Sequence, residues 1–542
     1  MRWEKVPGLL AAGSLAAAYT GDFARVSELY LHDPGREASF VARAQQLSAR
    51  QGADRSALAA ALEEYNRRIG NRPAALANAR RLADAETLAI VTGQQAGVLT
   101  GPLYTVYKAL QAVRLAEEMA ERLGRPVVPV FWIASEDHDL TEIDHLDLTD
   151  REGRLQRLRL QLEAPSHRSA GAVEAGQAAQ DLLQEVLQHL PETEFTPDLA
   201  SALEGLTAAG GSLADWFARI MAWLLGDRGL VLLDPMLPDL RRLAGPFVNR
   251  LLQRSQALAA AVRQGEEKVR GLGFQPALQA EADAAHLFFY EDGARLPLFR
   301  REGGFATRGG PLRSLDDLHT LIQTEPERFS GSVVTRPLIQ DYLLPTLAYV
   351  AGPGEISYYG LYRPVYAAAG LEAPVFVPRA SFTLVEPAAA RALEKQGLTV
   401  ERALSGLEAA RREVLEREDR IGLTGLFAAF RQDFDRRYGQ VIEQVLTLDR
   451  SLEQVAQENV RQIHAQFARL EEKARQQHRK NSEVAMRQFD RLALLLTPRQ
   501  QPQERVFNIM SYLARFGPAV LDAVAGVPAA RGGHFAVWLG GA

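Results

Sequence analysis

The fold of this chain is decided by residues 88–133, which read LAIVTGQQAGVLTGPLYTVYKALQAVRLAEEMAERLGRPVVPVFWI. A short apolar strand, residues 88–91, leads into a glycine-rich turn, and apolar side chains then recur at helical spacing from about residue 102 to residue 123. Residues 127–133 are apolar on both faces, as is typical of a strand inside a parallel sheet. The stretch therefore predicts a βαβ unit with a right-handed crossover.

Three further apolar segments extend this unit, at residues 230–233, 346–350 and 375–377. The pattern is interrupted twice, over about residues 145–228 and 271–332, and the second interruption contains a hairpin with its turn at residues 291–293. Residues before about 85 are expected to be helical. The sequence predicts an α/β fold, in which a discontinuous parallel core spans residues 1–420 and carries N-terminal helices and two insertions.

Residues 421–497 have the pattern of a coiled-coil arm, and residues 498–542 are expected to return to the core. Heptad spacing is clear at Ala456, Val460, Ile463, Phe467, Leu470 and Ala474, and again at Ala485, Phe489, Leu492 and Leu496. A helix at residues 426–448 can fold back on this seam but is too short to cover it. Since an uncovered apolar stripe is usually an interface, we expect a homodimer held through the arm.

Composition excludes several classes of protein. The 542 residues carry a net charge of −5, so no global basic field favours nucleic acid. The chain has no cysteine, which excludes disulfides and thiolate chemistry. No secretory signal and no membrane-spanning run of apolar residues is recognised, so we expect a cytoplasmic protein without a membrane partner.

Polar or glycine-rich loops follow all five expected strands. Because ligands bind beyond the carboxyl ends of parallel strands, these loops should meet in one cleft. They are residues 92–102, residues 135–139, Asp234, residues 352–355, and Arg379 with Ser381.

The first loop has glycines at positions 93, 97 and 101, which match neither the P-loop nor the dinucleotide fingerprint. Its backbone and the N-terminus of the next helix are suited to an anion or polar ligand, with Gln94 and Gln95 in the loop. Thr100 is expected to cap this helix, and Tyr104 and Lys108 lie one turn apart on it. The alternative is a tight turn that needs glycine only for its geometry.

The second loop places Glu136, Asp137, His138 and Asp139 at the end of a buried strand. So dense a cluster favours general base chemistry or the binding of a substrate amine. A metal site is a competing use, but no second histidine stands at a recognised spacing, so we assign no metal. The remaining alternative is a solvated acidic loop.

Weaker candidates lie near the other strand ends. Gly352, Gly354 and Glu355 follow the fourth strand, and Asp341 lies just upstream of it. Arg379 follows the fifth strand and adds a cation to the expected cleft.

Several of these segments together resemble the bacillithiol biosynthesis cysteine-adding enzymes, a family of cysteine ligases. The resemblance is carried by TGQQAGVLTGPLYTVYK (residues 92–108) and PVFWIASEDHD (residues 129–139). It continues at residues 336–360, 374–386 and 503–517, and so spans nearly the whole chain. It implies a Rossmann-like core with two connecting-peptide insertions and a coiled-coil dimerisation arm.

The resemblance also implies an activity, in which cysteine is joined through an amide to the amine of glucosaminyl-malate as the last step of bacillithiol assembly. Lys108 and Arg379 are then expected to bind the malate carboxylates. Gln94, Gln95 and Asp139 would bind sugar hydroxyls, and His138 or Glu136 would accept the proton of the attacking amine.

Two other functions stay open at this point: a nucleotide- or sugar-binding transferase that uses the same cleft, and a coiled-coil scaffold with a degenerate enzyme core. The family core is similar to class I aminoacyl-tRNA synthetases, but their HIGH and KMSKS motifs are missing. The sequence therefore assigns no cofactor, and ATP is a candidate without a binding motif.

Overall fold

The structure is a computed structural model that describes residues 2–7, 10–11, 13–162, 167–279, 281–418, 422–528 and 532–540. The chain divides into two compact units, residues 1–384 with 501–542, and residues 385–500. The first unit contains a five-stranded parallel sheet in the order β12-β11-β2-β3-β6. Its strands are β2 (Leu88–Gln94), β3 (Val127–Ile133), β6 (Val231–Leu233), β11 (Thr346–Ala351) and β12 (Val375–Pro378).

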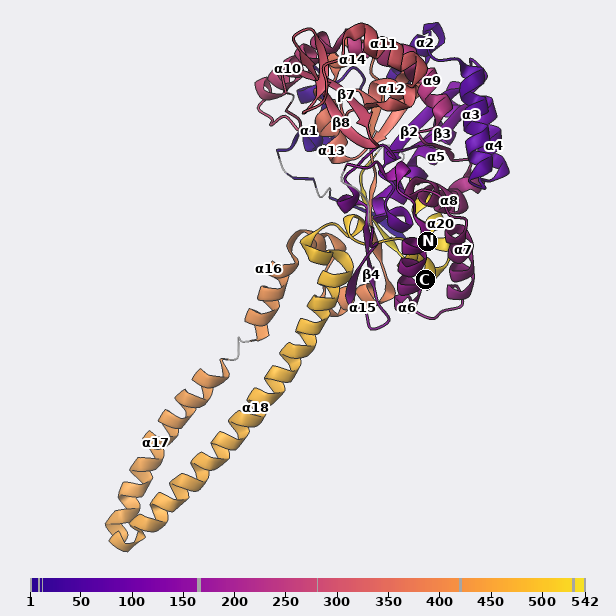
Figure 1. The fold of residues 1–542 in the computed structure, drawn as a ribbon. Coiled ribbons are helices and arrows are strands. Elements are labelled where there is room, and N and C mark those ends of the chain that lie inside the picture. The colour runs from indigo at the N-terminus through magenta and orange to yellow at the C-terminus, as the bar shows by residue number, and fades with distance from the viewer. Residues whose placement is uncertain are drawn as a thin grey trace. The chain divides into compact units, whose positions relative to one another are not determined.

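The expected α/β class is confirmed, because all five strands expected from the sequence are present and helices cover both faces of the sheet (Figure 1). Successive side chains of a strand point to opposite faces. Leu88 and Ile90 of β2 pack with α5 (Leu103–Leu123) and α2 (Glu37–Ala49). Ala89 and Val91 pack in the cluster that contains α3 (Arg55–Arg68) and α9 (Pro238–Gln253).

Two groups of elements interrupt the sheet in the sequence. The first holds the hairpin β4 (His145–Thr149) and β5 (Leu155–Arg159), then α6 (Gly176–His189), α7 (Thr196–Ala208) and α8 (Leu213–Leu225). The second follows α10 (Ser255–Gly271) and forms an antiparallel sheet in the order β10-β7-β8-β9, together with α11 (Leu315–Thr324). Its strands are β7 (Ala284–Glu291), β8 (Ala294–Arg301), β9 (Gly304–Thr307) and β10 (Phe329–Gly331). The turn between β7 and β8 has positive φ at Asp292 and Gly293, the conformation that a two-residue hairpin turn requires.

A third sheet joins segments from both ends of the chain. β1 (Trp3–Val6) pairs antiparallel with β14 (His534–Trp538), which lies beside β13 (Ser381–Val385). The helices expected before about residue 85 are present, but residues 3–6 form a strand instead, because they find a strand partner far away in sequence. The remaining helices of this unit are α1 (Leu15–Gly21), α4 (Pro73–Arg81), α12 (Arg336–Leu343), α13 (Pro353–Tyr359), α14 (Arg363–Ala369), α19 (Met510–Phe516) and α20 (Ala519–Ala525).

The second unit is helical: α15 (Pro387–Gln396), α16 (Val400–Glu418), α17 (Leu423–Leu448) and α18 (Glu453–Leu496). α17 and α18 form an antiparallel hairpin, in which Phe467 contacts the rings of Phe430 and Phe434 at centroid distances of 5.1 and 5.2 Å. α15 and α16 pack against α18 as well, and Phe489 is buried. The unit therefore begins at residue 385, before the expected start of the arm at residue 421.

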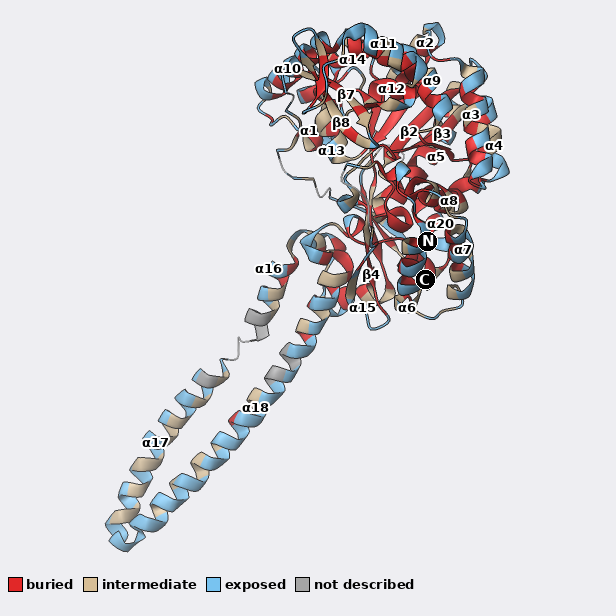
Figure 2. Ribbon diagram, viewed as in Figure 1, coloured by how far each residue is buried: buried red, intermediate tan, exposed pale blue. Residues whose placement is uncertain are grey.

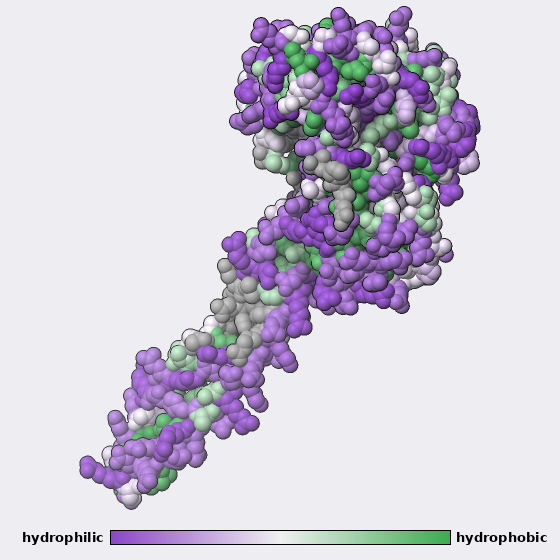
Figure 3. Space-filling model, viewed as in Figure 1, coloured by the Kyte–Doolittle hydropathy of each residue, from purple (hydrophilic) through white to green (hydrophobic). Residues whose placement is uncertain are grey.

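The hairpin is far more exposed than the sheet (Figure 2). Leu448 is 84% exposed and Val455 is 67% exposed, and Figure 3 shows apolar side chains on the hairpin surface. None of the helices in the described parts of the chain is both long and apolar enough to cross a membrane.

Candidate functional site

A cleft of about 440 Å³ lies at the carboxyl end of the parallel sheet. Its walls come from the loops after β2, β3, β11 and β12, together with α5, α12, α13 and the segment after residue 501. Of the candidates from the sequence, the lining includes Gln94, Gln95, Tyr104, Lys108, Asp137, Gly352, Gly354, Glu355 and Arg379.

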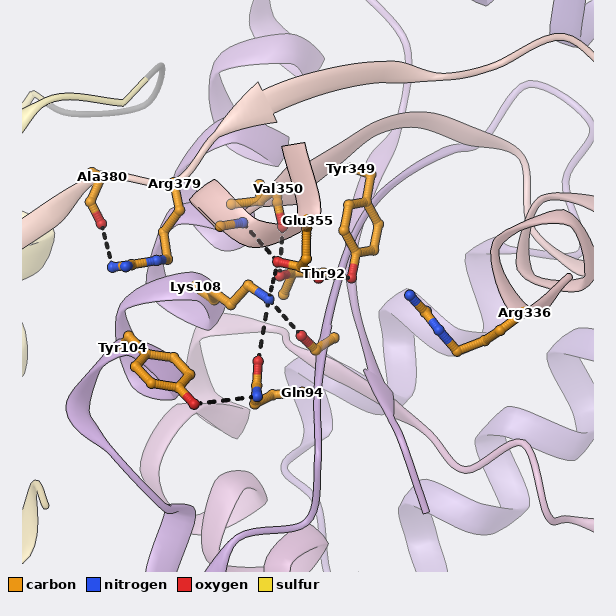
Figure 4. A network of polar contacts seen from close by, with 12 residues as sticks. Thr92, Gln94, Tyr104, Lys108, Arg336, Tyr349, Val350, Glu355, Arg379 and Ala380 are labelled. Atoms are coloured by element: carbon orange, nitrogen blue, oxygen red, sulfur yellow. Dashed lines mark hydrogen bonds and ion pairs between the residues drawn. The ribbon is translucent and has the colours of Figure 1, made fainter. Parts of the chain in front are cut away.

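Lys108 is a buried cation at the centre of a polar network in this cleft (Figure 4). Its Nζ lies 2.5 Å from Glu355 Oε2 and donates to the Gly93 carbonyl at 2.8 Å. Burial lowers the pKa of Lys108, and the attraction of Glu355 opposes that change. Glu355 also accepts hydrogen bonds from Tyr349 Oη at 2.8 Å and from the Gly352 N–H at 2.6 Å. Burial raises the pKa of Glu355, but Lys108 and these donors together bring it below its ordinary value.

Arg379 is likewise neutralised by a buried carboxylate. Its Nη1 and Nη2 donate to the two oxygens of Glu504 at 2.8 and 2.6 Å, a bidentate arrangement. Glu504 accepts further hydrogen bonds from Ser381 Oγ at 3.0 Å and the Phe382 N–H at 3.2 Å. The two cations that the sequence offered for anion binding are therefore both paired inside the protein.

Two other arginines of the cleft have no carboxylate within ion-pairing distance in the described parts of the chain. Arg336, at the start of α12, has Gln340 Oε1 at 3.4 Å and lies near Tyr349 and Tyr358. Figure 4 shows its guanidinium pointing toward the cleft. Arg505 is exposed, and its guanidinium lies 5.9 Å from the centre of the Tyr104 ring. Sequence reasoning named neither as a site residue, because neither directly follows an expected strand, although both lie in segments that carry the family resemblance.

The β3 side of the cleft is acidic. Gln95 Nε2 donates to Asp137 Oδ2 at 2.8 Å and to Glu142 Oε2 at 2.7 Å, so one amide group holds two carboxylates side by side. Neither carboxylate has a cation within ion-pairing distance among the described residues. The cleft thus offers free guanidinium groups and, after β3, free carboxylates.

The other residues of the second loop leave the cleft. Glu136 is buried and pairs with Arg241 at 2.6 Å. His138 Nδ1 lies 3.2 Å from Arg295 Nη1, and burial together with Arg295 lowers the pKa of this imidazole. Asp139 is exposed and accepts from the Thr141 hydroxyl at 2.6 Å. Only Asp137 of this loop lines the cleft.

Thr100 and Asp341 also lie outside the lining. The expectation that Thr100 caps α5 is wrong: the N-cap is Pro102, and no side chain caps the helix. Leu99, Thr100 and Gly101 take φ of 47°, 82° and 68°, and a capping residue is normally extended. Asp341 is fully buried and accepts from Tyr366 Oη at 2.7 Å, and burial raises its pKa.

Two glycines of the first loop are required by packing. A Cβ on Gly93 would lie 2.8 Å from the Trp132 carbonyl oxygen, and one on Gly97 would lie 2.8 Å from Gly101 Cα. The tight geometry of this loop brings the Gly93 carbonyl and Gln94 to Lys108. In the described parts of the chain no group of three histidine and acidic side chains is arranged to hold a metal.

A parallel sheet with a polar cleft at its carboxyl ends, joined to a unit of long paired helices, defines a Rossmann-like protein with a coiled-coil domain. Matches to family models identify the family within this class. Residues 1–380 match the N-terminal Rossmann-like domain of bacillithiol biosynthesis BshC, and residues 382–538 match its C-terminal coiled-coil domain. The chain therefore belongs to the BshC family of bacillithiol biosynthesis.

Relatives with the name "Putative cysteine ligase BshC" align over nearly their whole length. The protein of Symbiobacterium thermophilum is 47% identical over 99% of this chain and 100% of its own. That of Heliobacterium modesticaldum is 36% identical over 97% and 98%. That of Geobacillus kaustophilus is 36% identical over 95% and 96%.

Proposed function

We propose that this enzyme is a carbon–nitrogen ligase that joins cysteine through an amide bond to the amine of glucosaminyl-malate, the last step of bacillithiol biosynthesis. One observation carries the proposal: the cleft holds two guanidinium groups and two carboxylates whose charges are not paired with any residue that the structure describes. The acceptor substrate has the complementary groups, two carboxylates and one amine. The names of the relatives point to the same chemistry.

Arg336 and Arg505 are the groups that we assign to the malate carboxylates. Lys108 and Arg379 contribute less to binding in this proposal, because Glu355 and Glu504 already neutralise them. Their buried ion pairs instead fix the wall of the cleft. Gln94 and Tyr104, whose amide and hydroxyl groups lie 3.4 Å apart, can bind sugar hydroxyls.

Asp137 is the residue that we assign to the attacking amine. It lines the cleft beside Glu142, and a carboxylate in this position both attracts the ammonium form and accepts its proton. His138 is less suited to this role than expected, because Arg295 donates to its Nδ1 and its pKa is lowered. Glu136 is committed to Arg241. We assign both to positioning the loop that carries Asp137.

The proposal is tested by incubating the purified protein with glucosaminyl-malate and cysteine, with and without ATP, and following products by mass. Amide formation from a free carboxylate requires activation, so we expect product in the ATP arm, with release of AMP or ADP that depends on cysteine. A modified glucosaminyl-malate without cysteine, or nucleotide turnover without an amide product, would instead indicate a transferase.

The hairpin supports a second element of the proposal, the homodimer. Leu426, Phe430, Val441, Leu448, Val455 and Leu470 are apolar side chains of α17 and α18 that stay exposed in one chain. Exposed apolar surface of this kind marks an interaction site. We propose that a second copy of the hairpin covers it, and that the reaction takes place in the cytoplasm.

A further inference from the structure

A second, smaller cavity adjoins the cleft, and Trp132 and Arg336 line both. Its volume is about 20 Å³, on a scale where one water needs roughly 10–15 Å³. It therefore admits a group of one or two heavy atoms and excludes a sugar, a malate or a nucleotide. Most of its wall is apolar: Leu240, Ala244, Val248, Ile322, Phe329, Ile339 and Leu343.

The polar part of this wall contains Glu136, whose carboxylate pairs with the Arg241 guanidinium, and two N–H donors that have no acceptor in the described parts of the chain. Trp132 Nε1 and Arg241 Nε are buried, and neither finds a hydrogen-bond partner among the described residues. Trp132 is 1% exposed and Arg241 is 8% exposed. Buried hydrogen-bond donors nearly always have an acceptor in native proteins. We therefore expect a ligand with a lone pair to occupy this cavity.

We infer that this cavity receives the thiol-bearing side chain of cysteine. This inference rests on the proposed function, which supplies cysteine as a substrate. A CH₂SH group matches the cavity in size, its sulfur suits the apolar wall, and its lone pairs can accept hydrogen bonds from the two free donors. The backbone of the amino acid then lies at the mouth between Trp132 and Arg336, where its carboxyl group reaches the cleft.

The side chains of related amino acids are expected to fit this cavity less well than that of cysteine. Alanine leaves the donors unpaired, and methionine is too long. 2-Aminobutyrate fills the space but has no lone pair to accept from them. Serine keeps an acceptor but fills the space less completely. Selectivity for cysteine thus follows from the size of the side chain together with its ability to accept a hydrogen bond.

The test fills the cavity by one methyl group. Gly245 lines it in α9, and a Cβ there would lie 3.5 and 3.6 Å from atoms of Ile322, at ordinary contact distance. Gly245→Ala therefore takes up space without a clash. Gly205→Ala is the matched control, a helical glycine of α7 with no atom within 4 Å of its added Cβ.

Binding of L-cysteine and of glucosaminyl-malate is measured by titration calorimetry, each alone and in the presence of the other. Gly245→Ala should weaken cysteine binding about tenfold or more, the effect of one misplaced methylene in a tight pocket. It should change binding of glucosaminyl-malate less than about twofold, and Gly205→Ala should change neither. A second variant, Trp132→Phe, should weaken cysteine binding but leave the weak binding of 2-aminobutyrate unchanged.

Unaltered cysteine binding in Gly245→Ala, an equal loss for both substrates, or no cysteine binding by the wild-type protein in either arm would each overturn the inference. The proposed function has a separate readout. If the wild type forms no amide product while the variants change cysteine binding as expected, the ligase assignment fails and the cavity assignment stands.

Discussion

Replacing Arg336 by methionine should separate ligand binding from folding. The guanidinium has no carboxylate partner in the described protein, so its loss leaves no buried charge behind. We expect the free energy of unfolding to stay within about 1 kcal/mol of the wild type. Binding should suffer far more. A hydrogen bond to a charged group contributes about 1.5–3 kcal/mol, which corresponds to a Kd for glucosaminyl-malate about 10- to 150-fold higher.

Lys108→Met is the matched comparison, since both changes remove one cation from the same cleft. Lys108 holds Glu355 at 2.5 Å, and its loss leaves that carboxylate buried without its partner. Removing one member of a buried pair costs about 3–5 kcal/mol. Chemical denaturation should therefore show a large loss of stability for Lys108→Met and almost none for Arg336→Met.

Titration calorimetry measures the Kd of each variant for glucosaminyl-malate and for malate alone. An unchanged Kd in Arg336→Met would remove Arg336 from the site. A loss of stability in Arg336→Met as large as that of Lys108→Met would show that the guanidinium is structural, and the distinction between paired and unpaired cations would fail.

Three further predictions follow from the same structure. Asp137→Asn should lower the rate of amide formation by about 10²–10⁴-fold, the usual contribution of a general base, whereas His138→Gln should lower it less than about tenfold; equal losses in steady-state rates would contradict the assignment. Burial raises the pKa of Asp234 to about 6, above the ordinary value of 3.8. The stability that the protonated Asp234 carboxyl contributes is therefore fully present below about pH 3.8 and is lost as the pH rises through about 6. Asp234→Asn should therefore stabilise the protein by about 3 kcal/mol at pH 8 and by much less at pH 4, and a gain independent of pH in denaturation curves would refute this. Leu448→Glu with Val455→Glu should convert a micromolar dimer into monomers in sedimentation, and a monomeric wild type would exclude the dimer.

The sheet could be predicted because its signal is local. Residues 127–133 are apolar at every position, and a strand of that kind is buried on both faces wherever it lies. The strand ends then had to meet at one edge, which brings Gln95 to Asp137. Composition and spacing alone were enough for this part of the site.

The pairing of charges could not be predicted, because it depends on side chains that are distant in sequence. Lys108 meets Glu355, and Arg379 meets Glu504, through the order of the strands and the return of the C-terminal segment. The direction in which each side chain points could not be predicted either. Adjacent residues after β3 contact different neighbours: Asp137 lines the cleft, whereas Glu136 pairs with Arg241. The sequence marks the charged residues but not which of them remain available to a ligand.

The pairing of β1 with β14 has a consequence for biosynthesis. Residues 3–6 are synthesised long before their partners at residues 534–537, which follow only after the entire helical unit has been made. Until then β13 lacks its neighbour, and an unpaired strand edge is open to association with other chains. Glu504, the counter-ion of Arg379, also belongs to this late segment. A nascent chain that stalls before this segment can complete neither the third sheet nor the wall of the cleft. We therefore expect an interrupted translation product to be inactive and sensitive to proteolysis.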